Sequence, residues 1–130
     1  MITHRHILSY QGGDALNAPV DISAGAERNI DETIPGGSTD LSVAFNLVLA
    51  KLTALYILAD RPMTIETNSG SSPANTITLA ASVPFVWNSN MPAIRDTAGV
   101  AITTTITGLF VTLGAGADST LHLRCLVDPT

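Results

Sequence analysis

The stretch Leu121-His-Leu-Arg-Cys-Leu-Val127 alternates apolar and polar side chains over most of its length. Successive side chains of a β-strand point to opposite faces, so a period of two predicts a half-buried strand. One face of this strand would carry Leu121, Leu123, Cys125 and Val127, and the other His122, Arg124 and Asp128. The same period recurs along most of the chain and decides its fold class.

Upstream of this strand, Leu109, Val111 and Leu113 form a second inward row, and a Gly-rich turn at 114–118 separates the two. We expect these runs to form an antiparallel hairpin. Similar rows occur at 41–45, 63–67 and 77–79, between turn signals such as Pro35-Gly-Gly-Ser38. The pattern predicts eight or nine short strands in one all-β domain over residues 1–130, an antiparallel, jelly-roll-like β-sandwich.

Two segments, residues 45–59 and residues 1–10, are less clear-cut than these strands. Apolar residues between Phe45 and Tyr56 also match helical spacing, but we expect a strand ending near Asn46, one helical turn near residues 48–53, and a buried strand over 54–59. Residues 1–10 are expected to form an N-terminal arm or an edge strand.

Charged residues make up 13% of the chain, about half the usual share of about 25%. Such scarcity suggests that a partner covers part of the surface, although a chain rich in Ala, Thr and Gly can reach similar values unaided. The formal net charge is −5, and the six Lys and Arg residues are scattered singly. Without a basic stripe to neutralise phosphates, we expect no binding to nucleic acid.

The longest apolar-rich stretch, residues 47–59, is interrupted by Lys51 and Thr53. It is shorter than the ~20 residues that cross a bilayer, so no membrane partner is expected. The first residues do not resemble a signal peptide, because no apolar segment follows their positive charge. The single cysteine, Cys125, lies in an apolar run and is expected to be a small buried side chain without a disulfide.

Residues able to support catalysis are sparse. His4 and His6 form an H-x-H pair whose rings would share one face of a strand, and His122 is a conceivable third metal ligand. Two histidines at this spacing are a weak signal, and exposed polar positions on a terminal strand are the favoured explanation; the acidic residues lie mostly beside turns. No nucleophile motif or phosphate loop is present. We therefore expect no enzyme activity and no cofactor; a cupin-like enzyme would need the three histidines and an acid to converge.

Phe85 and Trp87 are spaced to share one strand face, which favours core packing. If Trp87 were instead exposed beside the Asn88–Pro92 loop, it would be the best interaction hot spot. A glycan-binding module would display Tyr10, Tyr56 or Trp87 on a concave face. The predicted partner-binding residues lie on the first strand and around this loop: Ile2, His4, His6, Trp87, Asn90, Met91 and Arg95.

Several segments together resemble small virion proteins of tailed bacteriophages. They are Val20-Asp-Ile-Ser-Ala-Gly-Ala-Glu27, Gly37-Ser-Thr-Asp-Leu-Ser-Val-Ala-Phe45, Ala54-Leu-Tyr-Ile-Leu-Ala-Asp60, Met63-Thr-Ile-Glu-Thr-Asn68, Pro84-Phe-Val-Trp-Asn88 and the 121–127 strand. The resemblance spans most of residues 7–128 and consists of strand patterns and turn residues.

This resemblance implies a β-sandwich or jelly-roll protein that decorates and cements a capsid. Such a protein would be a homotrimer bound to the major capsid protein at three-fold positions of the shell. It would be made in the bacterial host cytoplasm and located on the virion surface. A head-fibre, neck or tail component would have the same composition, and a glycan-binding β-sandwich is the alternative outside the virion.

Overall fold

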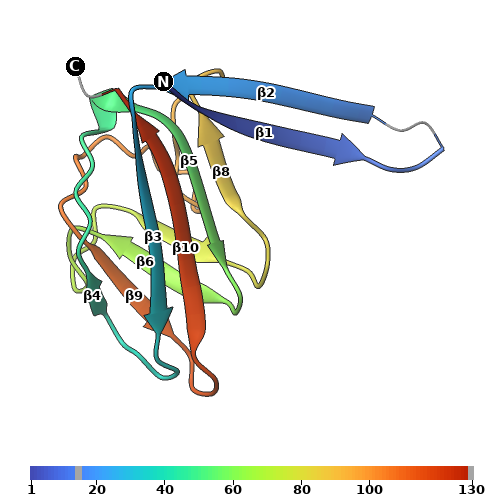
Figure 1. The fold of residues 1–130 in the computed structure, drawn as a ribbon. Coiled ribbons are helices and arrows are strands. Elements are labelled where there is room, and N and C mark those ends of the chain that lie inside the picture. Colours follow the sequence, from blue (N-terminus) through green and yellow to red (C-terminus); the bar gives the residue numbers. More distant parts are fainter. Residues whose placement is uncertain (14–15, 129–130) are drawn as a thin grey trace.

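The computed structural model describes residues 1–13 and 16–128. Figure 1 shows a two-layer β-sandwich with a long two-stranded hairpin projecting from one end. Within the described residues there are ten strands and one 3-10 turn. The predicted all-β antiparallel sandwich is confirmed, with ten strands instead of eight or nine.

Eight strands form the two layers. Sheet I has the order β3 (Ala26–Ile34), β10 (Ser119–Val127), β5 (Leu52–Ala59), β8 (Phe85–Asn88). Sheet II has the order β4 (Leu41–Val43), β9 (Leu109–Leu113), β6 (Met63–Thr67), β7 (Thr76–Leu79). The remaining two strands, β1 (Ile2–Tyr10) and β2 (Leu16–Ala24), form the projecting hairpin.

The strand pairing is that of a jelly roll. β3 pairs with β10, β4 with β9, β5 with β8, and β6 with β7, all antiparallel. The first half of the sandwich thus pairs with the second half as one long ribbon. Rolling the ribbon up also brings β10 beside β5, and β9 beside β6. The jelly-roll-like architecture is therefore confirmed.

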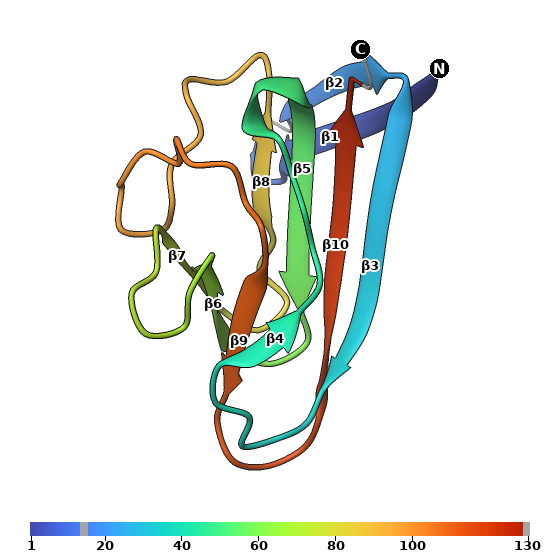
Figure 2. The ribbon, with the colours of Figure 1, turned by 90° about the vertical axis from the view of Figure 1, so that its left-hand side faces the viewer.

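The expected hairpin between residues 109–113 and 121–127 is wrong. Both runs are strands, but β9 belongs to sheet II and β10 to sheet I. The turn at 114–118 carries the chain from one layer to the other, as Figure 2 shows. Alternation fixes which side of a strand is buried, but it does not say which strand lies beside it.

The core lies between the two sheets and contains the apolar rows read from the sequence. β6 and β9 alternate buried and half-buried residues, and β10 does so as far as Cys125. The most enclosed residues come from both layers: Ile34, Ile65, Val111, Leu121, Leu123 and Cys125. Burying one such large aliphatic side chain contributes roughly 1.5–3 kcal/mol, so these rows hold the layers together.

The ambiguous segment contains the expected helical turn and buried strand, but the strand before them, β4, ends at Val43 and not near Asn46. A 3-10 turn covers Leu49–Lys51, and the buried strand β5 follows directly. β5 is apolar on both faces because Leu55 faces the main core while Ala54 faces a second, smaller cluster. That smaller cluster joins Ala54 and Leu126 of sheet I to Ile22 and Ala24 of β2. It fixes the root of the hairpin to the outer face of sheet I.

Candidate functional site

The two-stranded hairpin, here called the arm, is the feature that distinguishes this molecule from a plain sandwich. β1 and β2 pair in register from Ile2 opposite Ala24 to Tyr10 opposite Leu16. Within the described chain, neither strand pairs with a strand of the sandwich. The arm crosses the end of sheet I and continues beyond it into solvent (Figure 1).

The base of the arm is buried and its tip is not. Ile22 and Ala24 are buried, and Ile2 and Val20 pack against them. Toward the tip, Ile7 is 58% and Leu8 is 80% exposed. Residues 7–13 and 16–19 contain no charged side chain. An isolated two-stranded ribbon is only marginally stable in water, so these exposed apolar residues suit the outer part of the arm to contact with another surface.

The two faces of the arm differ in chemistry. On the face turned away from the sandwich, Arg5 makes two hydrogen bonds to Asp21, at 2.6 and 2.7 Å, and Thr3 bonds Ser23 at 2.7 Å. Hydrogen bonding to Arg5 lowers the pKa of Asp21 and in turn raises the pKa of Arg5. These cross-strand pairs hold β1 and β2 together on their solvent side.

The face turned toward the sandwich carries both histidines of the H-x-H pair. Their ring centroids lie 6.4 Å apart, as expected for alternate residues on one strand face. His4 Nε2 lies 2.8 Å from Glu27 Oε1 on β3, and this hydrogen bond lowers the pKa of the Glu27 carboxyl. The arm is thus tied to one edge strand of sheet I.

His6 ties the arm to the opposite edge strand. Asn88 Nδ2 on β8 donates to His6 Nδ1 at 3.3 Å, while Asn88 Oδ1 accepts from the backbone N–H of Asn90 at 3.0 Å. Burial lowers the pKa of His6, and the nearby His4 lowers it further. Hydrogen bonds at both edges of sheet I therefore set the direction in which the arm projects.

A groove of about 260 Å³ separates the arm from the outer face of sheet I. It is lined by Thr3, His4, Arg5, His6, Tyr56 and Arg124. Of these residues, Arg5 pairs with Asp21 on the other face of the arm, and Arg124 pairs with Asp31. The groove thus presents a tyrosine, two histidines and an arginine toward solvent.

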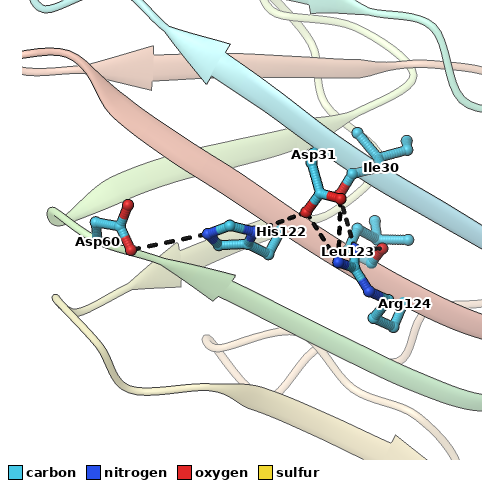
Figure 3. Close-up of polar contacts among 6 residues, drawn as sticks. All are labelled: Ile30, Asp31, Asp60, His122, Leu123 and Arg124. Carbon is cyan, nitrogen blue, oxygen red and sulfur yellow. Dashed lines mark hydrogen bonds and ion pairs between the residues drawn. The ribbon is translucent and has the colours of Figure 1, made fainter.

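Farther along the same face, Asp31 accepts from two basic side chains of β10, as Figure 3 shows. His122 Nδ1 lies 2.7 Å from Asp31, and Arg124 Nη2 lies 3.0 Å from both of its oxygens. His122 Nε2 also lies 3.8 Å from Asp60. Hydrogen bonds from His122 and Arg124 lower the pKa of Asp31. This cluster is a set of satisfied surface ion pairs that join β3 to β10.

The three histidines of the cupin-like alternative do not converge. His122 pairs with acids on sheet I, whereas His4 and His6 lie on the arm. Among the residues that the structure describes, no three His, Cys, Asp or Glu side chains could hold one metal ion. The cavity between the two sheets measures about 10 Å³, far below the 300–1,000 Å³ of common ligand pockets.

The predicted partner-binding residues divide into two groups. Ile2, His4 and His6 lie on the side of the arm that faces the sandwich, where each is half-buried. Trp87 is half-buried against the core, and its Nε1 donates to the carbonyl of Pro92 at 2.8 Å. The remaining three are exposed in the segment after β8: Asn90, Met91 and Arg95. Asn88 brings the two groups together, since it contacts both His6 and Asn90.

The aromatic platform of the glycan-binding alternative is only partly present. Trp87 packs inward, Tyr56 lines the groove, and the side chain of Tyr10 lies outside the described part of the chain. Sequence reasoning missed Ile7, Leu8 and Asn88. Two consecutive apolar residues at the end of a polar-faced strand were the available signal for the arm tip, but no signal in the sequence marked Asn88.

The outer face of sheet II is a second surface with little charge. Thr64 lies between Thr78 and Thr112 on neighbouring strands, and Glu66 lies between Thr76 and Phe110. Glu66 is the one ionisable side chain that these strands place on this face. This face therefore contributes to the low charge seen in the sequence.

Searches against protein-family profiles, curated proteins and solved structures find no match to this chain. No helix in the described residues has the length and apolarity needed to span a membrane. The jelly roll itself occurs in viral capsid proteins, lectins and cupins, so the fold is compatible with several functions. The arm and the surfaces around it are the features that set this molecule apart from other jelly rolls.

Proposed function

We propose that this protein is a structural component of a bacteriophage virion, a decoration protein that binds the major capsid protein and stabilises the shell. The observation that carries the proposal is the arm, which extends beyond its own sandwich with Ile7 and Leu8 exposed. The resemblance of the strand pattern to small phage virion proteins supplies the identity of the partner. In this role the protein is not an enzyme and acts only by binding.

The arm has two means of attachment. Each of its strands pairs on one side only, which leaves one backbone edge of each free to add to a neighbouring sheet. Its tip adds apolar side chains that lose water on contact. Backbone pairing places little demand on the partner's sequence, so a single arm can engage either a capsid subunit or another copy of this chain.

An arm that docks on a different surface of a second copy makes a head-to-tail contact. Such contacts close only as rings, and three copies form the smallest ring that would match a three-fold position on a shell. We therefore propose a homotrimer whose arms reach between subunits on the outer surface of the virion. Binding only to the assembled shell stabilises it by mass action, by about 4 kcal/mol at a thousandfold excess over Kd.

The test combines microscopy with one matched pair of variants. Electron microscopy of particles that contain the chain should show density on the shell at three-fold positions; density confined to a tail would contradict the decoration role. In co-sedimentation with shells that lack the protein, Leu8→Asp should weaken binding by at least about tenfold, equivalent to about 1.4 kcal/mol. Val83→Asp is the control, because Val83 is a similarly apolar exposed residue, at 56%, outside the arm.

A further inference from the structure

We propose that His6 is a pH-sensitive latch, which holds the arm against sheet I while its imidazole is neutral and loosens the arm when it is protonated. The latch regulates the arm on which the proposed function rests, but its existence can be tested without a shell. The inference depends on which atoms of His6 and Asn88 face each other, and the structure fixes this through a third residue.

The backbone N–H of Asn90 fixes the orientation of the Asn88 side chain. A backbone N–H can only donate, so the atom 3.0 Å from it must be the amide oxygen of Asn88. The amide nitrogen of Asn88 then faces His6 Nδ1 at 3.3 Å. An amide nitrogen can only donate, so Nδ1 must be the acceptor. The hydrogen bond therefore requires a neutral imidazole with its proton on Nε2.

Protonation of Nδ1 would turn this contact into two donors facing each other. The new charge would also be poorly compensated. Among the described residues, Nε2 is buried without a hydrogen-bond partner, and His6 forms no ion pair with an acid. A buried charge without a partner is unfavourable, so the protonated ring gains free energy by leaving its site for water.

The titratable groups around His6 also disfavour its protonation in the docked arm. On β1 its neighbours are His4 and Arg5, on β5 Tyr56 and on β10 Arg124, all of which line the same groove. On β3, Glu27 is engaged with His4. β8 contributes the neutral Asn88. The pKa of His6 is accordingly lowered, by burial first and by His4 second.

The sign of the pH dependence follows from this direction. A released His6 regains an ordinary pKa of about 6.5, so the released arm binds a proton more readily than the docked arm. Docking is independent of pH well above 6.5 and weakens as the pH falls below it. Each unit by which the docked pKa lies below the ordinary value changes the docking equilibrium about tenfold.

The test is hydrogen exchange of the β1 and β2 amides at pH 7.5 and pH 5.5, corrected for intrinsic exchange rates and compared with the amides of β5 and β10. In the wild-type chain the arm should lose protection at pH 5.5 while the sandwich keeps it. His6→Gln replaces the imidazole with a side chain that does not titrate but still offers an amide oxygen as acceptor to Asn88. This variant should show the same protection of the arm at both pH values. Asn88→Asp keeps the acceptor for Asn90 and offers a carboxylate to protonated His6, so it should hold the arm at pH 5.5.

His122→Gln is the control, because His122 lies at the Asp31 cluster away from the latch. Equal pH dependence of the arm in the wild type and His6→Gln would overturn the latch. NMR titration of the wild-type chain gives a result that requires no variant: His6 should titrate below 6.5 as the Nε2–H tautomer, and a higher pKa or the other tautomer would also overturn it. If the arm shows this pH dependence but the chain binds no shell, the latch stands and only the proposed function is contradicted.

Discussion

Gly36 and Gly116 are in backbone contact where the β3–β4 and β9–β10 loops meet. A Cβ added to Gly36 would overlap the carbonyl oxygen of Gly116. The N–H of Gly37 donates to the carbonyl of Gly114 at 3.0 Å, and the N–H of Gly36 donates to Asp118 Oδ1 at 3.0 Å. Both loops carry the chain from one sheet to the other. Their contact closes this end of the sandwich.

Gly36→Ala should therefore destabilise the whole sandwich. The added methyl group must displace backbone, and overpacking of this kind costs roughly 1–3 kcal/mol of the free energy of unfolding. Urea unfolding followed by the fluorescence of Trp87, the single tryptophan, measures the change. Gly114→Ala is the control from the same loop pair, because a Cβ at Gly114 meets nothing within 4 Å. Equal midpoints for the two variants would contradict the prediction.

Asp96 organises the long segment between β8 and β9. Its carboxylate accepts from Asn75 Nδ2 at 2.9 Å and from the backbone N–H groups of Val100 and Ala98 at 2.9 and 3.0 Å. Burial by itself would raise the pKa of Asp96, but these hydrogen bonds together hold the pKa below its ordinary value. The ionised carboxylate thus stabilises the fold above pH 4, and this contribution is lost as the pH falls through the lowered pKa.

Asp96→Asn should destabilise the protein at pH 7. The new amide NH2 group would be a donor, and so would the Asn75 amide nitrogen that now donates to the carboxylate. Leaving buried polar groups unsatisfied costs about 1–3 kcal/mol in the free energy of unfolding. Below pH 4 the gap between variant and wild type should narrow, because the wild type loses its carboxylate there. Asp31→Asn, at an exposed ion pair, should shift the urea midpoint less. A larger shift for Asp31→Asn would contradict the prediction that Asp96 contributes more to stability than Asp31.

The base of the arm offers a way to detach it without unfolding the sandwich. Ile22 packs with Ala54 and Leu126 in a cluster separate from the main core. Truncating a buried Ile to Ala costs about 2–5 kcal/mol, and here the cost falls on docking of the arm. Ile22→Ala should therefore speed exchange of the β1 and β2 amides and leave the Trp87 unfolding midpoint nearly unchanged. Ser23→Ala removes only the exposed hydrogen bond to Thr3, so it should speed this exchange much less and leave the midpoint unchanged. A lowered midpoint for Ile22→Ala would mean that arm and sandwich unfold together.

Local patterns in the sequence predicted strands and buried faces well. Residues 121–127, 63–67 and 54–59 lie in strands with the expected inward rows, and the helical turn falls at Leu49–Lys51. Which strands pair was harder to predict from the sequence. The alternation of β9 and β10 is the same whether they pair with each other or with strands far away in sequence. In this jelly roll, β6 and β7 are the only consecutive strands of the described sandwich that pair.

In the candidate site, too, the sequence predicted local features but not the contacts between distant segments. Alternation correctly placed His4 and His6 on one strand face. The same rule assigns Leu8 to that face, yet Leu8 is 80% exposed because the sandwich does not extend beneath it. Neither the projection of the arm nor the contact of Asn88 with His6 follows from a local pattern, since both depend on how β2 crosses sheet I.

Cys125 provides an independent measure of how often the sandwich opens. The side chain is fully buried on β10, and burial raises the pKa of its thiol although Arg28 opposes this. The reactive thiolate is thus both scarce and enclosed in the folded chain.

An aromatic disulfide reagent at pH 8 should therefore modify Cys125 only through unfolding. When opening and closing are fast, the labelling rate follows the population of the open form, so it should lie at least about a thousandfold below the rate in denaturant. Gly36→Ala should accelerate labelling about tenfold for each 1.4 kcal/mol that it costs, whereas Gly114→Ala should leave the rate near that of the wild type. Labelling of the native protein as fast as in denaturant would mean that β10 is open to solvent, and the buried position of Cys125 would have to be abandoned.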